Sequence, residues 1–343
     1  MTTDRARHEL AGVEFPDMTW TSFDRYGRYG AIVRALRASL GDRRLRVLDV
    51  GDSAGHLHAF DGGLDVVGID VDITDDRLAG AVVARADGAR LPFADATFDA
   101  VVSSDVLEHV PPGQRPAFLA ELRRVSSDLV IVAAPFDTPG VAGVEELVRR
   151  YALVALGTGQ PQLDEHRDNG LPDLDATVAA LVACGLEAVT VGDGHLWDWL
   201  LVMVLRFQLE ARPALGPLAA GYDVLYNASL SGRSLVPPYY RHLVVARSGG
   251  APEVGDRTVP DDLPPDFSAV AAALIAADST EVSRQDTVPR LDRLQYDMGD
   301  VTNRLVRLEE RIDALTELVE GVSAQVLAVK AKLARLVHPF RRG

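Results

Sequence analysis

The residues best suited to chemistry are concentrated between positions 46 and 110. An apolar, β-branched run ends in Val47-Leu48-Asp49-Val50-Gly51-Asp52-Ser53-Ala54-Gly55, where small residues let the backbone approach a ligand closely. A helix is expected next, and its first amides can receive an anionic group. Such a loop is weak support for a nucleotide site when taken alone, because many Rossmann-like proteins contain one.

Acidic residues follow the next two expected strands. Asp70 ends the second strand about twenty residues after Asp49, where an acid can accept both hydroxyls of a ribose. Asp87 and Gly88 follow the third strand, where an acid can accept the amino group of an adenine. The fourth strand runs into Ser103-Ser104-Asp105-Val106-Leu107-Glu108-His109-Val110, which is expected beside the same ligand. The four segments together are far more specific than any one of them.

This succession resembles the class I S-adenosylmethionine-dependent methyltransferases, in particular the type 11-like group of small-molecule methylating enzymes. The resemblance covers roughly residues 45–135 by motif and 25–247 by order of elements. It implies S-adenosyl-L-methionine as the cofactor. The cofactor-binding positions that it implies are Asp49, Gly51, Ser53 and Gly55 for methionine, Asp70 for ribose, Asp87 and Gly88 for adenine, and Ser104, Asp105 and Leu107 near the methyl group. The sequence departs from the family at Ser53, where the family has a glycine, and a loop that needs a positive φ there would be strained.

Three residues are candidates for catalysis. Methyl transfer is an in-line displacement with a neutral leaving group, so it needs positioning more than acid catalysis, while a hydroxyl acceptor also needs a base. His109 and Asp105 follow the fourth strand, although the family's histidine at the position of His109 often has a structural role. His166 lies in a polar loop, 164–172, that resembles a Glu-His…Gly-Leu-Pro segment of methyltransferases from bacterial surface-polysaccharide gene clusters.

That second resemblance predicts O-methylation of a sugar, glycan or glycolipid. Aromatic residues in the second half of the chain could stack on sugars, but aromatic residues at helical spacing more often belong to a core. Two alternatives stay open, namely a methyltransferase for a non-glycan metabolite and a non-catalytic Rossmann-like scaffold. A nicotinamide-dependent dehydrogenase is disfavoured, since the G-x-G-x-x-G spacing is absent.

The prediction includes no metal ligand. Some relatives, however, carry an acid, a Glu-His pair and a distal histidine as metal ligands. By that resemblance the alternative ligand set is Asp105, Glu108, His109 and His166.

The elements that must position these residues form an α/β pattern. Short continuous apolar runs at 46–50, 64–69, 81–85, 98–102 and 129–133 predict strands that are buried on both faces, as in a parallel sheet. Helical patterns lie at 32–40, 115–124, 144–156, 174–184 and 196–211, and further strands at 187–191 and 240–246. We expect a Rossmann-like, doubly wound three-layer sandwich with a mostly parallel seven-stranded sheet over residues 1–248.

Residues 249–343 follow a sequence pattern that differs from the α/β pattern before them. Residues 249–285 begin with many Pro, Gly and Asp residues and predict a linker. Apolar residues seven apart in two series offset by three, running from Leu291 to Leu336, predict a coiled coil over 286–338. We therefore expect a homo-oligomer through 291–336, or a coiled-coil partner. The basic C-terminus could also make a peripheral contact with an anionic membrane.

The composition of the chain limits the classes of substrate and partner that are expected. The formal net charge is −15, and an acidic surface repels phosphate backbones, so nucleic acid is not expected as a substrate. The single cysteine, Cys184, permits no internal disulfide, which fits a reducing compartment. The first ten residues are polar, and the most apolar run, 196–205, is too short to span a membrane. The predicted location is cytoplasmic, and the predicted partner is a small-molecule or glycan acceptor.

Overall fold

The structure is a computed structural model that describes residues 8–10, 13–15, 18–73, 77–210 and 216–260. The predicted coiled coil, the basic C-terminus and most of the predicted linker lie outside these residues, so they stay predictions. Residues 253–257 pack on the α/β unit, because Ser39 Oγ donates to the Glu253 carbonyl over 2.7 Å and Arg257 donates to the Gly192 carbonyl. No helix in the described part of the chain is both long and apolar enough to cross a bilayer.

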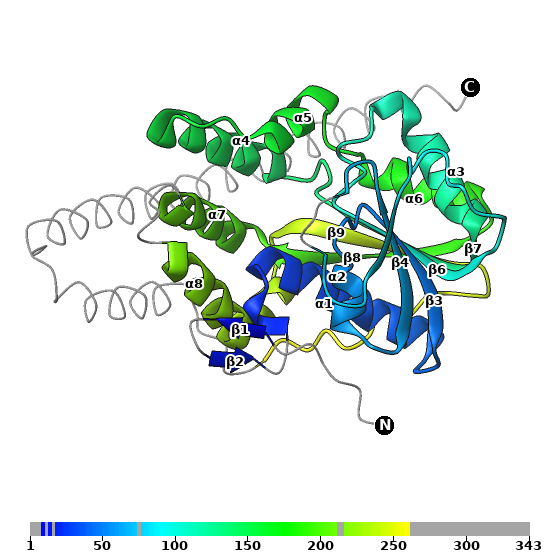
Figure 1. Ribbon diagram of the computed structural model, residues 1–343. Helices are drawn as coiled ribbons and strands as arrows, with labels where there is room; N and C mark the ends of the chain where they lie inside the picture. The colour runs from blue at the N-terminus through cyan, green and yellow to red at the C-terminus, as the bar shows by residue number, and fades with distance from the viewer. Residues whose placement is uncertain (1–7, 11–12, 16–17, 74–76, 211–215, 261–343) are drawn as a thin grey trace, which may run out of the picture. The chain divides into compact units, whose positions relative to one another are not determined.

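A seven-stranded mixed sheet forms the centre of the fold, in the order β5-β4-β3-β6-β7-β9-β8 (Figure 1). Its strands are β3 (Leu45–Val50), β4 (Leu64–Asp70), β5 (Val82–Arg85), β6 (Phe98–Ser104), β7 (Ser126–Ala134), β8 (Glu187–His195) and β9 (Tyr239–Arg247). The first five strands in spatial order are parallel, whereas β9 runs antiparallel to both β7 and β8. The expected Rossmann-like, mostly parallel seven-stranded sheet is confirmed. A separate two-stranded ribbon joins β1 (His8–Leu10) to β2 (Val13–Phe15).

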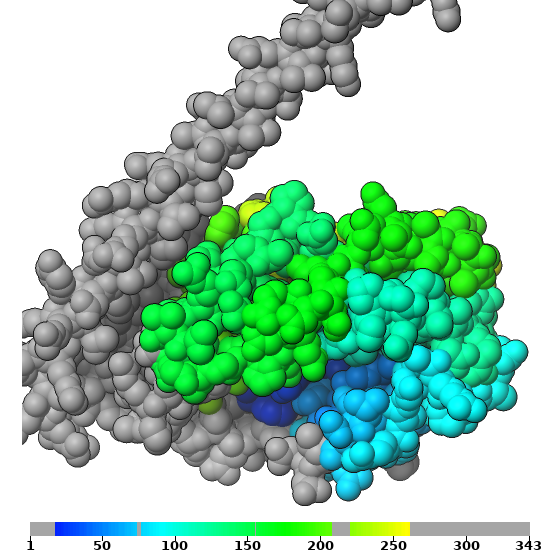
Figure 2. Space-filling model, turned by 90° about the horizontal axis from the view of Figure 1, so that it is seen from above, coloured from blue at the N-terminus to red at the C-terminus, as the bar shows by residue number. Residues whose placement is uncertain are grey.

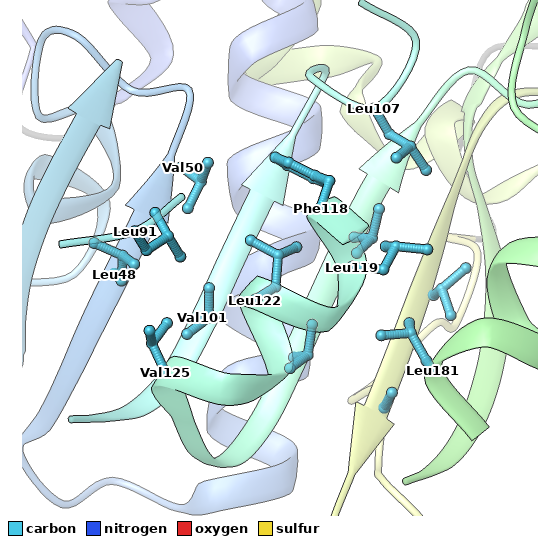
Figure 3. Close-up of a cluster of buried hydrophobic side chains, with 14 of the residues drawn as sticks. Leu48, Val50, Leu91, Val101, Leu107, Phe118, Leu119, Leu122, Val125 and Leu181 are labelled. Carbon is cyan, nitrogen blue, oxygen red and sulfur yellow. The ribbon is translucent and has the colours of Figure 1, made fainter. Parts of the chain in front are cut away.

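Helices cover both faces of the sheet, which gives the three expected layers. The helices on the two faces are α1 (Phe23–Leu40) with α2 (His56–Phe60), and α3 (Arg115–Val125) with α6 (Leu174–Ala183). Successive strand residues point to opposite faces, so Leu48 packs with Phe118 and Leu181 on one face while Val47 packs with Leu36 on the other. Figure 3 shows the first of these two cores, between β3, β6, α3 and α6.

A third apolar cluster lies in a group of helices that we call the helical cap. The cap consists of α4 (Val141–Tyr151), its π-helical continuation (Ala152–Leu156), α5 (Pro161–Asn169), α7 (Leu196–Glu210) and α8 (Gly216–Ser229). Its core is aromatic: Trp199 stacks on Tyr240 with ring centroids 3.9 Å apart, and Tyr222 and Tyr226 are buried beside them. Most of the aromatic residues that could have stacked on a sugar are therefore core, as their spacing favours.

One acid is buried in the sheet without a hydrogen bond to any described residue. Asp193 in β8 has no exposed surface, and neither of its carboxylate oxygens has a hydrogen-bond partner among the described residues. Burial raises the pKa of Asp193 to about 6, although the charges of Arg241, Arg34 and Arg257 act in the opposite direction. Ionising this carboxyl group therefore destabilises the folded state.

We predict that Asp193→Asn stabilises the protein in a pH-dependent way. Because the folded pKa lies above the unfolded one, the wild type loses stability as pH rises from about 4 to about 6, and the loss persists above that range. The variant should gain about 2–3 kcal/mol in free energy of unfolding at pH 7.5 and close to nothing at pH 4, measured by urea denaturation. Asp65→Asn, at an exposed position of β4, should show no such gain. Equal gains at both pH values would exclude ionisation as the cause.

Candidate active site

A cavity of about 940 Å³ lies at the carboxyl ends of β3, β4 and β6, facing the helical cap. This is where open α/β sheets bind ligands. Figure 2 shows dark-blue residues of α1 between the green segments of the cap and the light-blue chain around β4. The predicted site residues that line the cavity are Gly51, Ser53, Asp70, Asp87, Gly88, Ser104, Asp105, His109 and His166. Asp49, Gly55 and Leu107 do not line it, and Leu107 is buried in the core of Figure 3.

The loop after β3 comes close to neighbouring groups at its glycines. Gly51 has φ 97°, and a Cβ there would lie 2.2 Å from Cγ2 of Val106, so only glycine fits. Asp52 orders the rest of the loop, because its Oδ1 accepts the amides of Ala54 and Gly55 at 3.0 Å each. Ser53, which replaces a family glycine, is not among the described residues with positive φ, so it fits the loop without strain.

Asp49 lies behind this loop as a buried acid. It is 1% exposed, and neither carboxylate oxygen has a hydrogen-bond partner within the described ranges. Burial, together with the nearby charge of Asp52, raises the pKa of Asp49 well above its ordinary value. An acid held in this way favours a cationic group on the cavity side of the loop, because a positive charge would compensate its ionised form.

Two further acids lie at the edge of the cavity beside turns that they stabilise. Asp70 ends β4 and accepts the amide of Asp72 over 2.9 Å, while Asp87 accepts the amide of Ala89 over 2.9 Å. Each acid retains its second carboxylate oxygen for a ligand hydroxyl or amino group. Between them and the core, Gly88 leaves room for Phe118, whose Cε2 would be 2.6 Å from a Cβ at that position.

Asp105 is fixed by two arginines. Its oxygens accept Arg241 Nε and Nη2, each over 2.6 Å, and Arg28 Nη1 over 2.7 Å. Burial acts to raise the pKa of Asp105, but the charges of Arg241 and Arg28 outweigh it and hold the pKa at about 2. A carboxylate with this pKa is a very weak base at neutral pH. The geometry therefore gives Asp105 a positioning role in place of the catalytic role expected from the sequence.

The other two catalytic candidates are in contact with each other. His109 Nε2 and His166 Nε2 lie 3.3 Å apart, and Oε1 of the buried Glu108 lies 3.9 Å from His166 Nε2. The second nitrogen of each histidine contacts a carboxylate: Glu165 is 2.7 Å from His109 Nδ1, and Glu145 is 3.0 Å from His166 Nδ1.

Glu108, His109 and His166 form the group of possible metal ligands in the described part of the chain, with one ligand atom of each within 4.8 Å of the others. Asp105, the fourth member of the set raised from the sequence, is not part of this group, because its two oxygens contact arginines. The Oε2 atom of Glu108 is buried without a hydrogen-bond partner in those ranges, and burial with the charge of Asp105 raises the pKa of Glu108 well above normal.

Several residues of the site were not predicted. Glu145 and Tyr240, whose hydroxyl donates to Glu145 over 2.8 Å, hold His166, and Arg28 and Arg241 hold Asp105. The predicted polar loop 164–172 is helical as far as Asn169, because α5 begins at Pro161, a residue favoured at helix starts, and ends before Gly170.

Comparison with known proteins agrees with the arrangement around β3 to β7. Residues 48–129 match the family described as "Methyltransferase domain". An "uncharacterized methyltransferase" of Mycobacterium avium (strain 104) is 42% identical over 90 residues, which cover 23% of this chain and 34% of the relative. Another, from Mycolicibacterium gilvum (strain PYR-GCK), is 38% identical over 129 residues, covering 32% and 48%. The chain thus spans less than half the length of these relatives.

Solved structures with a similar chain course have low sequence identity. Magnesium protoporphyrin IX methyltransferase from Synechocystis PCC 6803, with bound SAH, is 16% identical, covers 66% of this chain and 83% of its own, and gives a TM-score of 0.42. A SAM-dependent methyltransferase from Archaeoglobus fulgidus is 14% identical, covers 64% and 92%, and gives 0.41. Residues 48–129 are thus similar to a methyltransferase domain.

Proposed function

We propose that the chain is a S-adenosylmethionine-dependent O-methyltransferase whose acceptor binds between the sheet and the helical cap. The observation that carries the proposal is the single cavity shared by both sets of residues. The loop after β3 and the acids Asp70 and Asp87 line its sheet side, and His166 of α5 lines its cap side. A cofactor bound on the first side and an acceptor on the second would meet at the end of β6.

The residues of the sheet side fit this cofactor. S-adenosylmethionine supplies an electrophilic methyl group on a positively charged sulfur. The uncompensated carboxyl of Asp49 favours a cation next to the loop, and Gly51 leaves the backbone accessible to the methionine part. Asp70 is suited to the ribose hydroxyls, and Asp87 to the adenine amino group.

For the acceptor we propose a hydroxyl of a sugar, glycan or glycolipid. The cap side of the cavity includes amide groups from Gln160 and Gln162 and apolar surface from Met203 and Phe207, with Glu165 and Arg206 as charged neighbours. Neutral hydrogen-bonding groups next to aromatic surface suit a polyhydroxylated ring better than a flat apolar metabolite. A non-glycan metabolite and a non-catalytic scaffold are the competing proposals.

We further propose that Glu108, His109 and His166 hold a divalent cation beside the acceptor. Ionised Glu165 and Glu145 can each accept a hydrogen bond only from a protonated Nδ1, and in the neutral histidines this leaves lone pairs on both Nε2 atoms, which face each other at 3.3 Å. Two lone pairs at this distance repel unless a proton or a cation lies between them. Histidine ligands of metals characteristically donate their other ring nitrogen to a carboxylate.

In this arrangement each residue has a distinct task. A divalent cation would lower the pKa of a bound acceptor hydroxyl. Glu145, itself fixed by Tyr240, orients His166, and Glu165 orients His109. This proposal departs from the metal-free expectation of the sequence, because the histidine tautomers set by the two carboxylates could not be foreseen.

The cofactor part is tested by binding of S-adenosylhomocysteine, the demethylated product. We expect Asp70→Ala to weaken binding by roughly 10–100-fold in calorimetric titration, since a carboxylate hydrogen bond to the ribose is lost. The matched control is Asp65→Ala, at the other end of the same strand and paired with Arg44 on the surface, which should bind as the wild type does. If the wild type shows neither binding nor a rise in melting temperature at saturating ligand, the scaffold is the correct reading.

The cation part is tested by Mn²⁺ binding, followed by electron paramagnetic resonance, and by turnover after chelation. His166→Ala should abolish Mn²⁺ binding, and Glu145→Gln should weaken it by roughly 10–100-fold because His166 is no longer oriented. His58→Ala removes a histidine outside the cavity and should leave Mn²⁺ binding unchanged. Chelation and dialysis should abolish methyl transfer, and added cation should restore it. Unchanged turnover after chelation would refute the cation while leaving the methyltransferase proposal intact.

A further inference from the structure

Four arginines line the cavity, and three of them have carboxylate partners within the protein. Arg28 and Arg241 bind Asp105, and Arg206 lies 3.1 Å from Asp223. The fourth, Arg25, has no carboxylate within salt-bridge distance among the described residues. Its Nε atom is buried without a hydrogen-bond partner in the same ranges.

The position of Arg25 is electrostatically unfavourable in three ways. Burial lowers the pKa of Arg25, and the positive charge of Arg28 lowers it further, although the charges of Asp24 and Asp52 act in the opposite direction. The residue also lies in the first turn of α1, an 18-residue helix whose amino end carries a partial positive charge. A guanidinium placed there is best explained by an anionic ligand that compensates it in the cavity.

A carboxylate from the loop after β3, that of Asp52, lines the same cavity as Arg25. Its Oδ1 contacts the loop amides and, over 2.9 Å, Nδ1 of His56, whereas its Oδ2 is buried with no hydrogen-bond partner in the described chain. Both groups line the same cavity, and the charge of Asp52 acts to raise the pKa of Arg25. An arginine nitrogen and a carboxylate oxygen that both lack a hydrogen-bond partner in the described chain suit a zwitterion, the charge pattern of an α-amino acid.

We propose that Arg25 and Asp52 bind the amino-acid end of S-adenosylmethionine, with Arg25 donating to its carboxylate and Asp52 accepting from its ammonium group. The inference rests on the proposed cofactor and assigns two residues to it. It favours the cofactor over the acceptor as the source of the anion because Asp52 belongs to the loop after β3, on the sheet side of the cavity. A neutral sugar would leave both charges uncompensated.

The test compares two ligands that differ only in the amino-acid end. S-adenosylhomocysteine carries that end, and 5′-methylthioadenosine lacks it. In calorimetric titrations Arg25→Met should weaken S-adenosylhomocysteine binding by roughly 10–100-fold and leave 5′-methylthioadenosine binding unchanged. Asp52→Asn, which keeps an acceptor oxygen for the loop amides, should show the same selectivity. Arg37→Met, in the same helix but outside the cavity, should alter neither affinity.

Stability provides a readout that a structural arginine would not give. Without ligand, Arg25→Met should melt at or above the wild-type temperature, since a half-buried charge with no salt-bridge partner among the described residues is removed, and its stabilisation by S-adenosylhomocysteine should shrink.

Three results would overturn the inference. One is equal weakening of both ligands. Another is an unchanged S-adenosylhomocysteine affinity with a raised KM for the acceptor, which would assign Arg25 to an acceptor anion. The third is a marked loss of apoprotein stability. A wild type that binds neither ligand would instead refute the proposed cofactor itself.

Discussion

The ion pairs of Asp105 connect three segments that are distant in the sequence. Arg28 comes from α1, Arg241 from β9, and Asp105 from the turn after β6, where its backbone takes φ 53°. Moving these charges out of water is unfavourable, and the short contacts offset that cost only while all three remain in place. Losing one partner from such a buried group typically destabilises a protein by about 3–5 kcal/mol. Glu108 and His109 lie three and four residues after Asp105, so the same pairs stabilise the segment that carries both residues.

The sheet side of the site could be read from the sequence because its determinants are local. Gly51 and Asp70 each follow a run of buried apolar residues, and parallel strands place their carboxyl ends at one edge. The motif therefore specified both the fold and most of the residues that line the sheet side of the cavity. The substitution at Ser53 was harmless for a reason that only the backbone reveals, since that residue does not take a positive φ.

The residues on the cap side of the site could not be predicted from the sequence, because their contacts join segments that are far apart in the chain. His166 meets His109 across 57 residues, and Arg241 meets Asp105 across 136. The hydrophobic periodicity of a single segment gives no information about contacts between segments so far apart in the sequence. The candidate base Asp105 illustrates the problem, since its residue type suited catalysis but the arginines that suppress its basicity come from other elements. Arg25 could not be predicted from the sequence either, because only the three-dimensional structure shows that it has no carboxylate partner among the described residues.

The position of β9 has a consequence for how the protein is made. This last strand of the sheet inserts between β7 and β8, and it carries both Arg241 and Tyr240. On the ribosome the chain emerges from its amino end, so the earlier strands are available long before β9. The sheet remains split until residue 247 has left the exit tunnel, and during that time Asp105 lacks Arg241 and Glu145 lacks Tyr240. A nascent chain therefore acquires its binding site in one late step, when the final strand closes the gap.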